Sequence, residues 1–209
     1  HEVFGIMENS HKPVIVAMHG TALGAGLEAA LACHYRCAAD SARVGLPEVS
    51  LGIIPGAGGS QRLPRLVGAK AALELILNIT PVDAVQALKI GILDHVIDGD
   101  FIEGAIAYAR TILAEGAGPR KTSEMRINTE GYTNEFLAEA RKTAAKKARG
   151  QNAPELVIEA ISHAIKLPFE EGIIEERRIG DEALVSEEAK ALRHIFFAER
   201  EIGNIPGLS

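Results

Sequence analysis

The sequence predicts an α/β half followed by an all-helical half, and three observations support this division. Short apolar runs broken by glycine fill the first half, where eight of the 21 glycines lie within residues 20–59. Beyond about residue 126, apolar side chains recur at the three- and four-residue spacing of helices. Between the two patterns, Gly116, Gly118 and Pro119 interrupt the chain, which places the predicted boundary at residue 116.

Short buried strands are expected to alternate with helices in the first half. Apolar runs bounded by turn residues predict strands at residues 13–19, 35–39, 43–46 and 93–97. Apolar residues at helical spacing predict helices at residues 25–33, 70–77, 81–90 and 101–113. In the third helix, Thr80 is the expected N-cap, Pro81 lies in the first turn and Gly91 is the C-cap. Because these strands are few for a stable sheet, we expect further strands upstream of residue 1.

Two further helices are expected in the second half, residues 117–202. The first carries an apolar stripe of Leu156, Val157, Ala160, Ile161, Ala164 and Ile165. The second is highly charged and ends in Ile195-Phe196-Phe197, and we expect that end to be buried against the α/β half or another chain. Residues 203–209 are typical of a linker because two glycines and a proline lie close together there.

The composition is that of an ordinary globular protein, with 47% apolar and 24% charged residues. The net charge is −6, and the densest basic stretch, residues 142–149, alternates with alanine, which argues against a nucleic-acid partner. No apolar run approaches the roughly 18 residues that a membrane span needs. The first ten residues contain acids and no apolar core, so we expect no signal peptide.

Two cysteines are too few for a disulfide framework and fit a reducing compartment. Together with His34, Cys33 and Cys37 form a short cluster of residue types that bind metals. We predict no metal there, because a strand following the helix would turn these side chains to different faces and no fourth ligand is nearby.

Two isolated carboxylates stand out in apolar, glycine-rich sequence. Glu28 is the only polar side chain in residues 22–33, and Glu48, directly after Pro47, is the only charge in residues 44–57. A buried carboxylate without a partner costs several kcal/mol, on the order of a buried charge. An arginine partner for Glu28 and a solvated loop for Glu48 are the simple explanations. If the two meet in space, however, one pKa rises and the pair titrates as a unit, as an acid and a base must.

The turn Gly24-Ala25-Gly26 opens the predicted helix that carries Glu28. The first amides of a helix lack partners within the helix and carry partial positive charge, so they stabilise a developing oxyanion. Ala25 and Glu28 are three residues apart and therefore lie on one face of the first turn. An N–H donor and a carboxylate are thus expected to point at the same reacting group.

Two glycine patterns admit other interpretations. Gly24-x-Gly26-x-x-Ala29 matches a dinucleotide-binding fingerprint, with Glu48 about 20 residues on as the ribose-binding acid. Residues 20–23 separate the predicted strand from Gly24, and this gap disfavours a dinucleotide-binding site. The stretch 56–60 is able to cradle a phosphate or to form a tight turn into a helix, and we favour the turn because the Gly-Lys-Ser/Thr of a P-loop is lacking.

Three segments carry a recognisable pattern: HKPVIVAMHGTALGAGLEAALACHYRCAA, VGLPEVSLGIIPGAGGSQRLPRLVG and ALKIGILDHVI. Together they resemble the crotonase (enoyl-CoA hydratase/isomerase) family over roughly residues 5–115. The joint spacing of Glu28 and Glu48 makes the resemblance specific. The segments LPFEEGIIEER and ALRHIFFAERE are similar to the hydratase half of multifunctional β-oxidation enzymes, which fuse a hydratase to an NAD-dependent 3-hydroxyacyl-CoA dehydrogenase.

The resemblance implies a fold and a set of site residues. It implies a crotonase-like ββα spiral over residues 1–116 with its early part upstream, a helical region over 117–202 and a linker over 203–209 toward a dehydrogenase domain. Glu28 and Glu48 are the implied catalytic carboxylates, and Ala25 supplies an oxyanion-hole amide. The implied substrate-binding residues are Gly24, Pro47 and Gly56.

The function implied by the resemblance is hydration of trans-2-enoyl-CoA to 3-hydroxyacyl-CoA in fatty-acid β-oxidation. The alternatives are a Δ3-Δ2 enoyl-CoA isomerase and a non-catalytic fragment that serves as an interaction module. Hydration needs no cofactor, and NAD is expected only with a dehydrogenase half. Acyl-CoA is the expected substrate, and a homo-oligomer or a β-oxidation complex is the expected assembly. A bacterial cytoplasm is the expected location, with the peroxisome and the mitochondrial matrix as alternatives.

Overall fold

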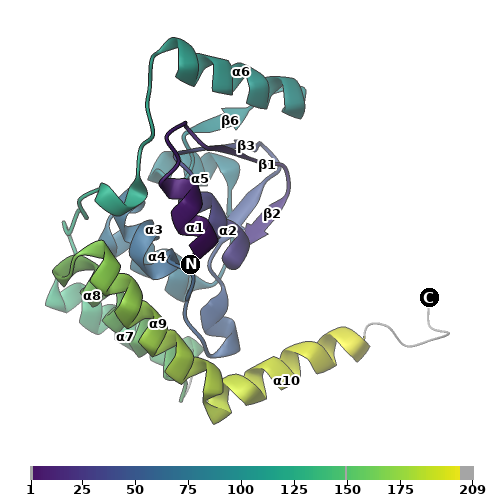
Figure 1. Cartoon of the computed structure of the whole chain (residues 1–209). Coiled ribbons are helices and arrows are strands. Elements are labelled where there is room, and N and C mark those ends of the chain that lie inside the picture. Colours follow the sequence, from purple (N-terminus) through teal and green to yellow (C-terminus); the bar gives the residue numbers. More distant parts are fainter. Residues whose placement is uncertain (1, 149, 203–209) are drawn as a thin grey trace.

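The computed structural model describes residues 2–148 and 150–202. Strands and helices alternate in its first part (Figure 1). They are, in chain order, α1 (Glu2–Glu8), β1 (Ile15–Met18), β2 (Thr21–Leu23), α2 (Ala25–Leu31), β3 (Tyr35–Ala39), β4 (Arg43–Gly45), the 3-10 helix η1 (Glu48–Leu51), α3 (Gly59–Val67), α4 (Ala69–Asn78), β5 (Val82–Asp83), α5 (Ala84–Ile90), β6 (His95–Ile97) and α6 (Phe101–Ala114). The rest is helical: η2 (Thr122–Glu124), α7 (Asn134–Lys147), α8 (Ala153–Lys166), α9 (Phe169–Val185) and α10 (Glu187–Ile202).

Within the described residues, the strands form two three-stranded sheets. In the first, β1, β3 and β6 are parallel, with Ile15 opposite Tyr35 and Cys37 opposite His95. In the second, β2 pairs in parallel with β4, and β4 pairs in antiparallel with β5. The chain passes from a strand in the first sheet to a strand in the second and then to a helix, in β1-β2-α2 and again in β3-β4-η1-α3. This repetition confirms the ββα spiral that the resemblance implied.

Several predicted elements are confirmed and others need correction. The strand at residues 35–39 is β3, and Gly91 caps α5 in the left-handed conformation, with φ of 91°. Thr80 is not the N-cap of that helix. Asp83 takes this role by accepting a hydrogen bond from the amide of Gln86 at 2.8 Å. The helix begins later than predicted because residues 82 and 83 pair with β4 before it starts.

The helical part packs against the α/β part through α8 and α9. Figure 1 shows α7, α8 and α9 together on one side of the molecule. The predicted stripe of α8 is buried, with Val157, Ala160 and Ile161 fully enclosed. The core is aliphatic, as the scarcity of aromatic residues suggests, and its largest enclosed apolar side chains are leucines and isoleucines. Residues 115–121 connect α6 to η2, and a domain division at residue 116 stays a prediction.

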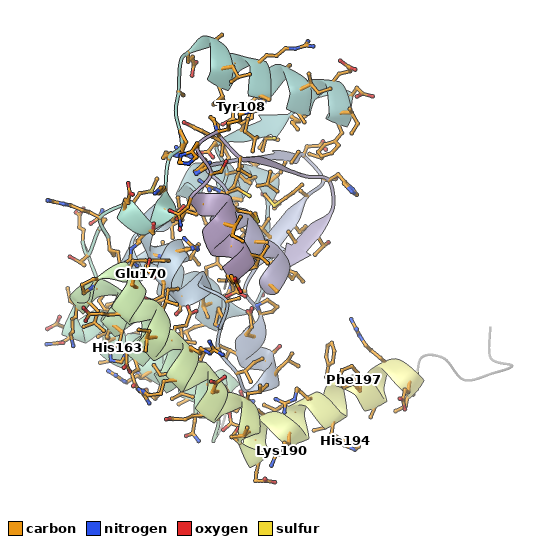
Figure 2. All side chains as sticks on the ribbon, viewed as in Figure 1. Tyr108, His163, Glu170, Lys190, His194 and Phe197 are labelled. Atoms are coloured by element: carbon orange, nitrogen blue, oxygen red, sulfur yellow. The ribbon has the colours of Figure 1, made fainter. Side chains whose placement is uncertain are left out.

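The charged C-terminal helix is two helices, because the chain turns at Ser186 with ψ of 150°. The second, α10, extends away from the α/β part in Figure 1, and Figure 2 places Lys190, His194 and Phe197 along it. Ile195 and Phe197 are 51% and 58% exposed. Burial of these two side chains against the α/β half, as predicted, is therefore wrong, whereas Phe196 between them is half-buried and lines a cavity with residues of that half. Burial of this end against another chain stays a prediction. The linker predicted at residues 203–209 lies outside the described residues.

Among the helices that the structure describes, none has the length and apolar character that crossing a membrane requires. The short helix α1 was not predicted. It is tied to α3 by a buried ion pair, in which Arg62 Nη1 lies 2.6 Å from Glu8 Oε1.

Candidate active site

One cavity, with a volume of about 740 Å³, collects every site residue that the sequence suggested. Its wall includes the first turn of α2, the start of η1 and the loop before α3, and its outer side is formed by α9 and α10. The predicted residues that line it are Gly24, Ala25, Glu28, Pro47, Glu48 and Gly56. Segments far apart in the sequence thus bring both carboxylates to the same space.

Glu28 lies in the first turn of α2 and is only 3% exposed. Its Oε1 accepts hydrogen bonds from the amides of Ala57 at 2.7 Å and Gly59 at 2.8 Å. Burial raises the pKa of Glu28, while these two amides and the charge of Arg62 act in the opposite direction. The arginine partner suggested by the simple explanation is not what binds Glu28, because Arg62 pairs with Glu8 and backbone amides hold the carboxylate instead.

Glu48 begins η1 directly after Pro47 and is half-buried. Among the described residues, its buried Oε2 has no hydrogen-bond partner. Burial, followed by the negative charge of Glu28, raises the pKa of Glu48 to about 7. A group with this pKa holds a proton in a large fraction of molecules at neutral pH and releases it readily, as a general acid must. The charge of Glu28 thus acts on the pKa of Glu48, as the sequence suggested for two carboxylates that meet in space.

Glycines let the backbone approach both carboxylates closely. A Cβ atom on Gly24 would lie 3.1 Å from Glu48 Oε1, and one on Gly59 would lie 2.7 Å from Glu28 Oε1. Gly24 also has a positive φ of 56° where β2 turns into α2. Ala25 follows as the first residue of α2, so the helix itself does not satisfy its amide. Ala25 lines the cavity together with Glu28.

A third buried carboxylate, Glu176 on α9, was missed by sequence reasoning. It is fully enclosed, and it binds the amides of Gly58 and Ser60, next to those that bind Glu28. Seven other acidic or basic residues lie in the segment 169–182, so Glu176 does not stand out in the composition. Its spacing from Gly172, Ile179 and Ala183 is the signal that was available, because these four positions form the buried face of α9.

The structure agrees with the interpretations favoured for the two glycine patterns, although one reason given for them was wrong. Strand β2 runs directly into Gly24, so the reason given against a dinucleotide site was wrong. Glu48 nevertheless starts a 3-10 helix facing Glu28 rather than ending a second strand. The stretch 56–60 turns into α3, and the amides of residues 57–60 are bound to carboxylates instead of being available to a phosphate.

The cluster of Cys33, His34 and Cys37 is engaged in backbone contacts. His34 Nδ1 accepts a hydrogen bond from the amide of Val14 at 2.8 Å, and its Nε2 lies 2.9 Å from the carbonyl oxygen of Glu8. Both cysteines are buried and free. Within residues 2–148 and 150–202, no three His, Cys, Asp or Glu side chains are grouped so as to hold a metal ion.

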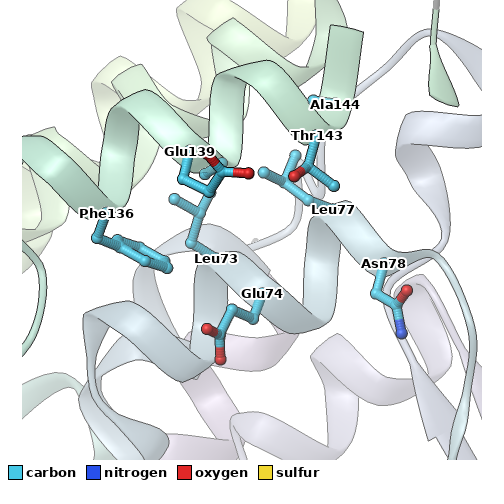
Figure 3. A pocket seen from close by; sticks show the side chains of 9 residues that line it. Leu73, Glu74, Leu77, Asn78, Phe136, Glu139, Thr143 and Ala144 are labelled. Carbon is cyan, nitrogen blue, oxygen red and sulfur yellow. The ribbon is translucent and has the colours of Figure 1, made fainter. Parts of the chain in front are cut away.

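A second cavity of about 390 Å³ lies between α4 and α7 (Figure 3). Its wall is largely apolar, with Leu73, Leu77 and Phe136. Its two carboxylates, Glu74 and Glu139, are exposed to solvent. It contains none of the residues that the sequence suggested, so the cavity with the paired carboxylates is the candidate active site.

A family profile described as Enoyl-CoA hydratase/isomerase matches residues 2–145, more than half of the chain. The chain belongs to the enoyl-CoA hydratase/isomerase family. Among solved structures of similar proteins, a carnitinyl-CoA hydratase from Mycobacterium avium is 34% identical with a TM-score of 0.56, covering 90% of this chain and 60% of its own. A carnitinyl-CoA dehydratase from Mycobacterium thermoresistibile is 22% identical with a TM-score of 0.67. The match covers 93% of this chain and 64% of the other and supports the shared fold.

Similar members of the enoyl-CoA hydratase/isomerase family are much longer proteins. The peroxisomal bifunctional enzyme of Cavia porcellus is 42% identical over 194 residues, which are 93% of this chain and 27% of the relative. The fatty acid oxidation complex subunit alpha of Shewanella loihica is 40% identical over 215 residues, covering 97% and 30%. The chain therefore spans less than a third of the length of these relatives.

Proposed function

We propose that this chain hydrates trans-2-enoyl-CoA to 3-hydroxyacyl-CoA, as the hydratase part of a multifunctional β-oxidation enzyme. The observation that carries the proposal is the pair of carboxylates, buried Glu28 and half-buried Glu48, that line one cavity at the start of α2. The names of the relatives, a bifunctional enzyme and a fatty acid oxidation complex subunit, support the β-oxidation context.

Hydration requires one group that accepts a proton from water and another that gives a proton to carbon. Glu28, as a carboxylate, takes a proton from the water whose oxygen bonds to C3. Glu48, as a carboxylic acid, donates its proton to C2, and the amide of Ala25 stabilises the negative charge on the thioester oxygen meanwhile. The elements of one water are thereby added across the C2=C3 bond. A proton then passes from Glu28 to Glu48 through solvent and restores both groups.

The hydrogen bonds at Glu28 suit the role of base. Both amides bind Oε1, which leaves Oε2 as the oxygen that receives neither of them and can face water. The amides also counteract the effect of burial on the pKa of Glu28, whereas Glu48 Oε2 has no hydrogen-bond partner among the described residues. Different environments thus separate the acid from the base.

The test is crotonyl-CoA hydration by full-length variants carrying Glu28→Gln or Glu48→Gln. Each change is expected to lower kcat by at least about 10²-fold, the lower range for a positioned acid or base. The dissociation constant of a saturated acyl-CoA should change little, and Glu170→Gln on the exposed face of α9 is the matched control. Near-normal turnover in both active-site variants would overturn the proposal.

An isomerase activity is the second candidate, because Glu48 alone has the features that a proton transfer between C4 and C2 needs. Its Oε2 lacks a partner in the described part of the chain, and its pKa is about 7. A Glu28→Gln variant that isomerises a 3-enoyl-CoA but no longer hydrates crotonyl-CoA would establish both activities in one site. Loss of both reactions would exclude a separate isomerase role for Glu48 alone.

The assembly, cofactor use and location of the chain are also proposals. We expect NAD only where a dehydrogenase half accompanies this hydratase. The relatives include proteins named peroxisomal and glyoxysomal as well as bacterial complex subunits. The bacterial cytoplasm remains the location proposed from the sequence.

A further inference from the structure

A four-residue turn connects two buried carboxylates at the back of the cavity. The amides of Ala57 and Gly59 donate to Glu28 Oε1, at 2.7 and 2.8 Å. The amides of Gly58 and Ser60, which alternate with them, donate to Glu176 Oε1 and Oε2, at 2.6 and 3.0 Å. Successive N–H groups along the turn therefore point alternately to Glu28 and to Glu176.

This arrangement links the orientation of one carboxylate to the position of the other. Each peptide group is planar and each residue has only two soft torsion angles, so fixing the amides of residues 58 and 60 restricts those of residues 57 and 59. Two further contacts fix Glu176: Ser60 Oγ donates to its Oε2 at 2.5 Å, and the Nε2 of Gln61 donates to that same Oγ at 3.1 Å. Glu176 itself lies on α9, which packs against both α3 and α8.

We infer that Glu176 is a positioning residue for the candidate base. By holding the amides of Gly58 and Ser60, it sets the two amides that orient Glu28 Oε1 and so directs Glu28 Oε2 toward the water. This inference goes beyond the proposed hydratase function. Only its kinetic test rests on that function.

The surroundings of Glu176 are consistent with this role. Burial, and to a lesser extent the charge of Glu28, raises the pKa of Glu176 to about 8 despite its hydrogen bonds with Ser60 and Gly58. Three donors, the amides of Gly58 and Ser60 and the hydroxyl of Ser60, point at this carboxyl group, so its role in the turn is that of an acceptor. A neutral acceptor that fills the same space is expected to retain part of its function, which makes glutamine the conservative replacement.

The kinetic test compares Glu176→Ala with Glu176→Gln in the full-length protein. Ile179→Ala is the matched control, because Ile179 lies on the same buried face of α9, is 1% exposed and contributes no hydrogen bond to the turn. We expect Glu176→Ala to lower kcat by about 10²-fold, the loss typical of a misplacement of about 1 Å, with KM changed far less. Glu176→Gln should recover part of the loss, and Ile179→Ala should keep kcat near normal.

A double-mutant cycle separates positioning from general damage. In a Glu28→Gln background, Glu176→Ala should cause no further fall in the residual rate, because its effect passes through Glu28. An equal fold-loss in both backgrounds, or a kcat for Glu176→Ala that matches Ile179→Ala, would overturn the inference. If the alanine variant fails to fold, the same double-mutant cycle is measured with Glu176→Gln in place of Glu176→Ala.

A second readout does not depend on turnover. Carboxyl NMR titration of Glu28 should show a changed pKa in Glu176→Ala, because two of the interactions that set this pKa come from the turn. The same titration should be unchanged in Ile179→Ala. An unchanged Glu28 titration in Glu176→Ala overturns the positioning role even in a protein that hydrates normally. A different outcome would overturn only the proposed function. In that outcome the wild-type protein does not hydrate crotonyl-CoA, but the pKa of Glu28 still changes between wild type and Glu176→Ala.

Discussion

Replacing Glu48 by glutamine is expected to make the protein more stable at alkaline pH while removing its turnover. The side chain is half-buried beside Glu28, and burial followed by that neighbouring charge raises its pKa from the ordinary value of 4.5 to about 7. The folded protein therefore tolerates the protonated form of Glu48 better than the ionised form. Glutamine has nearly the same shape and never ionises.

The sign and size of the effect follow from linkage between protonation and folding. A carboxyl group whose pKa is higher in the folded state favours folding fully below its unfolded pKa, and this contribution is lost as the pH rises through about 7. A shift from 4.5 to about 7 corresponds to about 3 kcal/mol, at roughly 1.4 kcal/mol for each pKa unit. This is an upper limit because part of the Glu48 side chain remains in contact with solvent.

The assay is urea unfolding of wild type and Glu48→Gln at several pH values from about 4 to 9. The difference in free energy of unfolding should be near zero at the acid end and should grow in favour of the variant to at most about 3 kcal/mol above pH 8. Glu170→Gln, an exposed replacement on α9, controls for the generic effect of an amide. A difference that stays flat with pH, or that falls as the pH rises, would refute the reasoning.

Three further predictions concern the site and its support. In wild type, kcat/KM should fall as the pH rises through about 7, because Glu48 must hold its proton. It should also fall at acid pH, because Glu28 must be ionised and its pKa is raised. A pH profile without the alkaline fall would contradict the assignment of Glu48 as the acid. Gly59→Ala should lower kcat by about 10²-fold, because its Cβ would lie 2.7 Å from Glu28 Oε1, whereas Gly26→Ala, with open space around it, should keep near-normal turnover. Arg62→Met should lower the free energy of unfolding by about 3–5 kcal/mol, because it removes the ion-pair partner of the buried carboxylate of Glu8. A loss below about 1 kcal/mol in urea unfolding would contradict this prediction.

The two candidate catalytic residues, Glu28 and Glu48, could be found in the sequence because a carboxylate in apolar surroundings costs free energy. Glu28 is the only polar side chain in a helix that is apolar on every side, and Glu48 is the only charge in a glycine-rich stretch. Carboxylates in such places need a compensating role, so their isolation was informative. Strand β3 was equally visible because it is a continuous buried run with turn residues on both sides.

The shortest elements could not be predicted, because their partners rather than their own residues define them. Strands β2 and β5 have three and two residues, too few for any periodic pattern. Pairing of β5 with β4 delayed the start of α5 and made Asp83 the N-cap, although Thr80 has equal capping chemistry. Tertiary pairing thus overrode a locally reasonable choice.

Glu176 and the division of the C-terminal helix were hidden for a different reason. The segment around Glu176 is rich in charge, so a solvated face was the natural interpretation. Only the spacing of the buried positions on α9 distinguishes Glu176 from its neighbours, the half-buried Glu175 and the exposed Arg177. Its hydrogen-bond partners lie 116 and 118 positions earlier in the chain, beyond the reach of any local pattern.

That separation bears on how the protein acquires its site during synthesis. The turn that orients Glu28 is made early, but the acceptor for two of its amides arrives 116 residues after Ser60. At ribosomal rates of about 5–20 residues per second, the interval is roughly 6 to 23 s. During this time the sheets can form, because β1, β3 and β6 all precede residue 98. The ordered site is therefore expected to appear after the scaffold, at the moment when α9 docks on α3.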